Sequence, residues 1–267
     1  MSAPTSTRPT FDDTAWDRAR RWRPTGRGLA IAALLLIALV ALMLTTSRRT
    51  GYLDPAAVDP SGSRAVANVL GDQGVRVTDV RTTADAAANA RAATVLITES
   101  ALVTSEMVSD VLDSGPARIV LIDPLPGSPV LERVAAGLEI TDVAGDDPVA
   151  PGCRLPDARR AGSAALPGTR YDARAWVPAG DACYDTPESA ALVVIPAREG
   201  RSEVVVLGSA HPLTNEGFDA QGNAALALSL LGSRDELVWW RPVPSDPALA
   251  GQAGASIAEL VPAWVVP

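Results

Sequence analysis

Apolar and polar positions between residues 61 and 138 follow two alternating rhythms. Apolar residues at helical spacing between a Ser61 or Ser63 cap and a Gly74 stop predict a first helix. Further helices are predicted within residues 83–93, 104–115 and 128–138. Between them, apolar strands are predicted at residues 75–80, 94–98 and 118–123. The alternation indicates parallel strands joined by helices.

The rhythm breaks between about residues 141 and 190 and then resumes. The break is rich in Gly, Pro and Asp, and we interpret it as an insertion of short antiparallel strands. Two strands (191–196 and 202–209), a helix (221–232) and a last strand (236–240) follow. We therefore predict the α/β class, with a mostly parallel sheet flanked by helices in one domain over residues 59–242.

A membrane anchor is predicted ahead of this domain. Residues 28–46 carry no charge. As a helix they would span about 28 Å at ~1.5 Å per residue, close to the thickness of a bilayer's hydrocarbon core. Five arginines lie within residues 18–27, directly before the segment, and two follow it closely, which places the N-terminus in the cytoplasm and the domain outside. The alternatives are a cleaved signal peptide, which a poor cleavage site disfavours, and a buried helix.

The remaining segments are connectors and ends. Residues 1–27 are predicted to be a cytoplasmic segment that is first disordered and then basic, and residues 47–58 a linker. The tail, residues 243–267, finishes in an apolar run. That run is either a loose end or the start of a second membrane segment.

Composition narrows the function and the compartment. The net charge of −8 argues against nucleic acid, whose phosphates need a basic partner surface. Cys153 and Cys183 both follow the anchor, where disulfides persist, and we expect them to be bonded rather than free. With a single histidine far from both cysteines, no metal-ligand spacing is present.

Familiar catalytic and cofactor motifs are absent from the sequence. The chain has no lysine for a phosphate-binding loop, no G-x-G-x-x-G after a strand, no H-E-x-x-H and no G-x-S-x-G. A Ser-His-Asp triad would have to use His211, and Ser209 stands only two residues before it. We predict no cofactor and no intact catalytic site.

Geometry nevertheless gives a candidate ligand rim, since α/β sheets bind ligands beyond the carboxyl ends of their strands. These ends are followed by Arg81, Glu99 and Ser100, Asp123, and Ser209 with His211. The first helix begins near the same edge, where Ser61, Ser63 and Arg64 could hold an anion. Asn215 and Glu216 are expected to brace their loop through side-chain hydrogen bonds. The rim is either a small-molecule site or an ordinary solvated loop edge.

Two sequence blocks resemble a known family. They are "LDPAAVDPSGSRAVANVLGDQGVRV" and "VVVLGSAHPLTNEGFDAQGNAALALSLLG", with "LVWWRP" after the second. Together with the anchor they resemble the uncharacterised bacterial membrane-protein family classed as domain of unknown function 4350. The resemblance implies a flavodoxin-like sandwich similar to class I glutamine amidotransferases. It also implies partners in the membrane, a MoxR-type AAA+ ATPase and a von Willebrand A-like protein.

Three functions follow as hypotheses. The first is a non-enzymatic, membrane-anchored domain that binds an envelope partner. The second is a hydrolase that uses His211 with Asp123 or Glu99, although neither cysteine sits on the strand-to-helix elbow of an amidotransferase. The third is a sensor of a small ligand at the strand-end rim.

Overall fold

The computed structural model describes residues 34–35, 51–172, 181–186 and 189–250. It divides the chain into two compact units, Met1–Thr50 and Gly51–Pro267. Apart from Leu34 and Leu35, the predicted span at residues 28–46 lies outside the described residues, as does the apolar end of the tail. Among the helices that are described, none has both the length and the apolar character needed to cross a bilayer.

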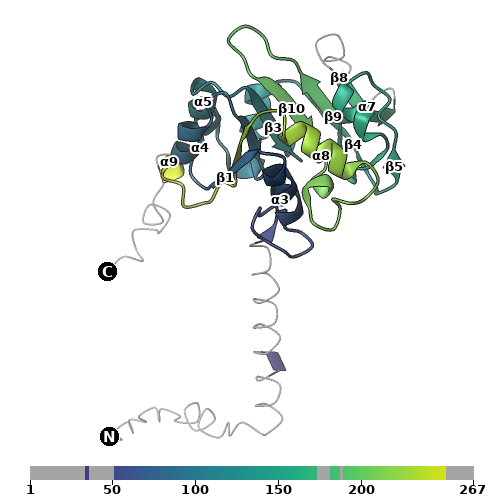
Figure 1. The fold of residues 1–267 in the computed structure, drawn as a ribbon. Helices are drawn as coiled ribbons and strands as arrows, with labels where there is room; N and C mark the ends of the chain where they lie inside the picture. Colours follow the sequence, from purple (N-terminus) through teal and green to yellow (C-terminus); the bar gives the residue numbers. More distant parts are fainter. Residues whose placement is uncertain (1–33, 36–50, 173–180, 187–188, 251–267) are drawn as a thin grey trace, which may run out of the picture. The chain divides into compact units, whose positions relative to one another are not determined.

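A mixed sheet forms the centre of the second unit, and five of its strands are parallel (Figure 1). Their order across the sheet is β1-β11-β2-β3-β10. These are β1 (Arg76–Val80), β11 (Glu236–Trp240), β2 (Thr94–Ile97), β3 (Arg118–Ile122) and β10 (Glu203–Leu207). All five lie within the strands that the sequence predicts. The prediction is most direct for β2, β3 and β10, because these strands carry almost continuous apolar runs that are buried on both faces of the sheet.

Antiparallel strands continue the sheet beyond β10. They are β9 (Ser189–Ile195), β7 (Gly168–Tyr171), β4 (Ile140–Ala144) and β8 (Asp181–Thr186), and all but β9 come from the predicted insertion. A separate pair is formed by β5 (Pro148–Val149) and β6 (Ala164–Ala165). The sheet is therefore mixed, and its antiparallel half is larger than the sequence indicates.

Helices cover both faces of the sheet. One face carries α3 (Arg64–Asp72), α7 (Pro156–Ala161) and α8 (Asn223–Leu231), whose apolar side chains share a core with Trp239. The other face carries α4 (Thr83–Asn89), α5 (Ser105–Asp113) and α6 (Pro129–Val134), which pack around Trp240. Figure 1 shows α3 and α8 together in front of the sheet. The remaining short helices are η2 (Ser100–Leu102), η3 (His211–Leu213) and α9 (Pro247–Ala250).

The chain enters this unit through a segment that is part of the fold. Leu53 is fully buried, and its carbonyl accepts a hydrogen bond from the Trp239 indole at 2.9 Å. The compact unit thus starts at Gly51, within the segment that the sequence suggests is a linker. The entry segment is too short to show the apolar periodicity of a helix or a strand, so its sequence does not predict that it packs on the domain.

The disulfide predicted from the sequence is confirmed. Cys153 and Cys183 are bonded across a separation of 30 residues, and Cys183 is fully buried. The bond ties the segment before α7 to β8, so it holds the insertion together.

Candidate functional site: the carboxyl edge of the parallel strands

The carboxyl edge contains the point at which this type of sheet normally binds ligands. β3 and β10 are parallel neighbours, but β3 leads to α6 on one face and β10 leads to α8 on the other. Such a reversal opens a crevice between the two strand ends in α/β folds. Asp123 follows β3, and Gly208 and Ser209 follow β10.

Strand β7 of the insertion fills this crevice. A Cβ atom on Gly208 would lie 2.0 Å from the Thr169 carbonyl oxygen, so the two backbones are in direct contact. The Thr169 hydroxyl donates to an Asp123 carboxylate oxygen at 2.6 Å. Tyr171 is fully buried, and its hydroxyl donates to the Pro124 carbonyl at 3.4 Å. Backbone and side chains of the protein itself therefore occupy the usual ligand position.

A small acidic cluster remains beside the filled crevice. The pKa of Tyr52 is raised to about 12 by burial and by the nearby charges of Asp123 and Glu99, which places these three residues together. Burial also raises the pKa of Glu99 above its usual value. Among the described residues, no hydrogen bond or ion pair reaches the Glu99 carboxylate. Tyr52 is a member that sequence reasoning missed, because it lies in the presumed linker.

Asp123 is held in an unusual backbone conformation. Its φ angle is +42°, in the left-handed region that side chains other than glycine rarely adopt. Its amide donates to the Leu207 carbonyl at 2.7 Å, so β10 fixes the turn. Burial and the charge of Asp123 together raise the pKa of Tyr171 as well.

The predicted anion site at the start of α3 is occupied by the protein. The Asn215 side-chain oxygen accepts from the Ala65 amide at 2.9 Å, which is the bond that a helix cap supplies. Ser63, the residue preceding α3, is fully buried, and its hydroxyl has no hydrogen-bond partner among the described residues. Ser61 donates to Asp59 at 2.7 Å, and Arg64 is exposed. The Ala65 amide is therefore not free to bind an anion.

Asn215 braces a different segment from the one expected. Its side-chain amide donates to the carbonyls of Ala57 and Asp59 at 2.9 and 2.7 Å. These bonds join the loop after β10 to the entry segment, whereas the sequence predicts bonds within Asn215's own loop. Glu216 contributes its backbone amide, which donates to Pro60, and its side chain is exposed.

His211 starts η3 and packs against its own loop. The backbone amide of His211 donates to Ser209 at 3.3 Å, so that hydroxyl is engaged as an acceptor. A Cβ on Gly217 would lie 2.6 Å from the imidazole Nδ1, which shows how closely the loop encloses the ring. No hydrogen bond or ion pair connects His211 with Asp123 or Glu99 in the described part of the chain. In the part of the chain that the structure describes, His211 is therefore not arranged with either carboxylate as in a hydrolytic triad.

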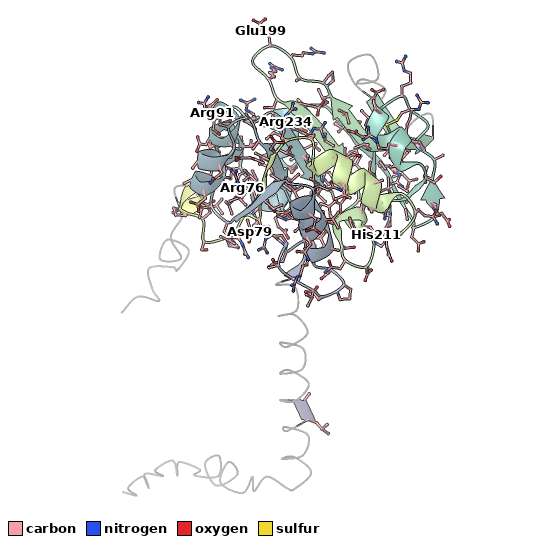
Figure 2. All side chains as sticks on the ribbon, in the orientation of Figure 1. Arg76, Asp79, Arg91, Glu199, His211 and Arg234 are labelled. Carbon is pink, nitrogen blue, oxygen red and sulfur yellow. A yellow bond between two sulfur atoms is a disulfide. The ribbon has the colours of Figure 1, made fainter. Side chains whose placement is uncertain are left out.

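A network of ion pairs lies at the carboxyl ends of β1 and β11, on the same edge of the sheet. Arg241, after β11, is almost fully buried and donates to both carboxylate oxygens of Asp79 at 2.9 and 2.6 Å. It also contacts Asp54 of the entry segment at 2.8 Å. Burial would lower the pKa of Arg241, but the hydrogen bonds and charges of Asp79 and Asp54 outweigh it and raise the pKa. Figure 2 shows Asp79 and His211 towards the same, lower side of the domain.

Comparison with known proteins identifies the family of the chain. The family described as Domain of unknown function (DUF4350) matches residues 55–231, which is more than half of the chain. The chain belongs to the DUF4350 family. The start of the family match within the entry segment agrees with the docking of that segment in the structure.

A curated relative of this DUF4350 protein is the uncharacterized membrane protein Rv3691 of Mycobacterium tuberculosis (strain ATCC 25618 / H37Rv). The two are 32% identical over 252 residues, which is 92% of this chain. The chain spans 61% of the relative's length. No solved structure matches the chain.

Proposed function

We propose that this protein is a non-enzymatic, membrane-anchored domain that binds or scaffolds a partner outside the cytoplasm. The observation that carries the proposal is the filled crevice between β3 and β10. A substrate would have to displace the contact of Thr169 with Asp123 and the close packing of Gly208 on β7. Both cysteines are bonded, so neither is a nucleophile.

The membrane location in this proposal has two supports. One is the uncharged segment at residues 28–46 with arginines before it. The other is the relative, which is named as a membrane protein. The expected partners, a MoxR-type ATPase and a von Willebrand A-like protein, come from the family resemblance. The flavodoxin-like character of the sandwich is part of the same proposal.

Complementation of a deletion strain tests the proposal against its rival, a hydrolase or sensor at the strand-end rim. We expect His211→Ala and Glu99→Gln, separately and together, to restore the wild-type envelope phenotype, because neither side chain has the contacts of a catalytic group. Loss of complementation by a double variant that folds normally would support the enzyme instead.

A further inference from the structure

A groove at the opposite end of the strands has the charge and lining of a binding site. It lies between the C-terminal ends of α5 and α6 and the hairpin that joins β9 to β10, and its volume is about 390 Å³. The groove therefore lies beside the amino end of β10, away from the carboxyl edge where the chain enters the domain. Figure 2 shows Glu199, at the tip of this hairpin, far from Asp79 and His211.

Three arginines surround the groove, and they are not neutralised by carboxylates. Arg133, Arg198 and Arg201 are exposed, and the described residues give none of them an ion pair within 4.0 Å. Arg133 uses its Nε to donate to the Ser109 hydroxyl at 3.1 Å, which leaves its terminal nitrogens available. The one acidic residue of the lining is Asp113, so the lining carries a net positive charge.

The floor of the groove is apolar. Leu112, Val134 and Ile195 are half-buried there, and Val204 is buried beneath them. An anion alone would not use this surface, whereas a ligand with both apolar and anionic groups would use the floor and the arginines together. Guanidinium groups bind carboxylates through paired, planar hydrogen bonds.

The arginines of a second groove are paired, unlike those of the first. It has a volume of about 570 Å³ and lies along α7 and α8. Its two arginines are engaged: Arg118 pairs with Glu203, and Arg160 pairs with Asp157 at 3.4 Å. The groove between α5, α6 and the β9–β10 hairpin differs from this second groove in that its three arginines have no carboxylate partner within 4.0 Å among the described residues.

We propose that the groove bounded by Arg133, Arg198 and Arg201 binds an acidic peptide segment of a partner protein, with apolar side chains on the floor and carboxylates on the arginines. This inference rests on the proposed binding function and names the chemistry of the partner. Two backbone hydrogen bonds join Arg198 and Arg201 across the hairpin turn, so one turn carries both guanidinium groups.

The test is fluorescence anisotropy with the full chain in non-ionic detergent and a labelled peptide of alternating glutamate and leucine. We expect saturable binding that weakens with salt, and little binding of the matched glutamine-leucine peptide. The double variant Arg198→Glu with Arg201→Glu should weaken binding of the peptide by about tenfold or more, because it removes the charged hydrogen bonds of both arginines to the peptide carboxylates. Arg133 also complements the C-terminal dipole of α6, so it is left unchanged.

The control is Arg91→Glu with Arg234→Glu, which changes the net charge equally at exposed arginines outside the groove (Figure 2). Equal weakening by both double variants would overturn the site, as would equal binding of the two peptides. Binding of anionic lipid vesicles in place of the peptide would also overturn it. If partners still copurify with the chain but the peptide does not bind, the groove proposal is wrong and the proposed binding function stands. Loss of complementation by the rim variants would remove the proposed function.

Discussion

At the residue scale, Asn215 is the side chain that fixes the loop after β10 to the start of the domain. It makes three hydrogen bonds to the backbone of residues 57, 59 and 65. The sequence identifies Asn215 as a bracing residue because short polar side chains often bond to nearby backbone. It could not identify the partners, which lie about 150 residues away and depend on the packing of the whole sheet.

Asn215→Ala should therefore lower the free energy of unfolding by about 2 kcal/mol, because it leaves a helix amide and two carbonyls without partners. Chemical denaturation of the purified chain measures this change. Glu216→Ala is the control, since that side chain is exposed, and we expect a change of less than about 0.5 kcal/mol. Equal effects of the two substitutions would contradict the bracing role.

Glu99 should make stability depend on pH. Because burial raises its pKa in the folded state, the folded protein binds more protons than the unfolded one between the usual glutamate pKa, about 4.3, and the raised value. Its contribution to stability therefore falls as pH rises through that window. Glu99→Gln should be more stable than wild type at pH 7, and the difference should shrink towards pH 4. Denaturation curves at several pH values test this, and a constant difference would contradict it.

At the scale of elements, the two ends of the β1–β11 pair are joined by different kinds of ion pair. β1 and β11 share an exposed ion pair, Arg76 with Glu236, where the strands begin. Where they end, Arg241 binds Asp79 and Asp54 in a nearly buried network. Removing one partner of a surface pair costs little stability, whereas removing a partner of a buried arginine costs more, because it leaves a buried charge unpaired.

Asp79→Asn should destabilise the protein by about 2 kcal/mol, since it weakens the two hydrogen bonds that neutralise Arg241. Glu236→Gln, on the partner strand at the exposed end, should change the free energy of unfolding by less than about 0.5 kcal/mol. Thermal or chemical denaturation of both variants gives the comparison. A larger effect at Glu236 would mean that the network is not what holds these strand ends.

The packing of β7 on β10 can be tested at one glycine. Gly208→Ala places a methyl group against the Thr169 carbonyl and should cost about 2–3 kcal/mol. The control is Gly145→Ala, because an added Cβ there meets nothing within 4 Å. If Gly208→Ala were as stable as Gly145→Ala, the crevice would be looser than the structure indicates.

Elements with strong apolar patterns were predictable, and those that depend on distant pairing were not. The runs that form β2, β3 and β10 predict buried strands directly. β7 has only four residues, including a glycine and an arginine, and it is a strand because β4 and β9 pair with it. Helix α7 has six residues and an arginine pair, and its short pattern does not predict a helix. The closed crevice depends on β7, so it could not be predicted either.

At the scale of the whole molecule, the disulfide stabilises the insertion that fills the crevice. A cross-link over 30 residues contributes about 3–4 kcal/mol through the lost freedom of the unfolded chain. Cys153→Ala with Cys183→Ala should lower the free energy of unfolding by about that amount. Reduction of the wild-type protein should have a similar effect, and insensitivity to both treatments would show that the fold does not rely on the bond.

The central claim is that this DUF4350 protein acts by binding partners and not by catalysis at the strand-end rim. The most direct measurement is purification of the tagged chain from a mild-detergent membrane extract, with quantitative mass spectrometry of the proteins that accompany it. The account predicts that an AAA+ ATPase or a von Willebrand A-like protein is enriched equally by wild type and by His211→Ala with Glu99→Gln. A protein that purifies alone, or partners that are lost with the rim variant, would contradict it.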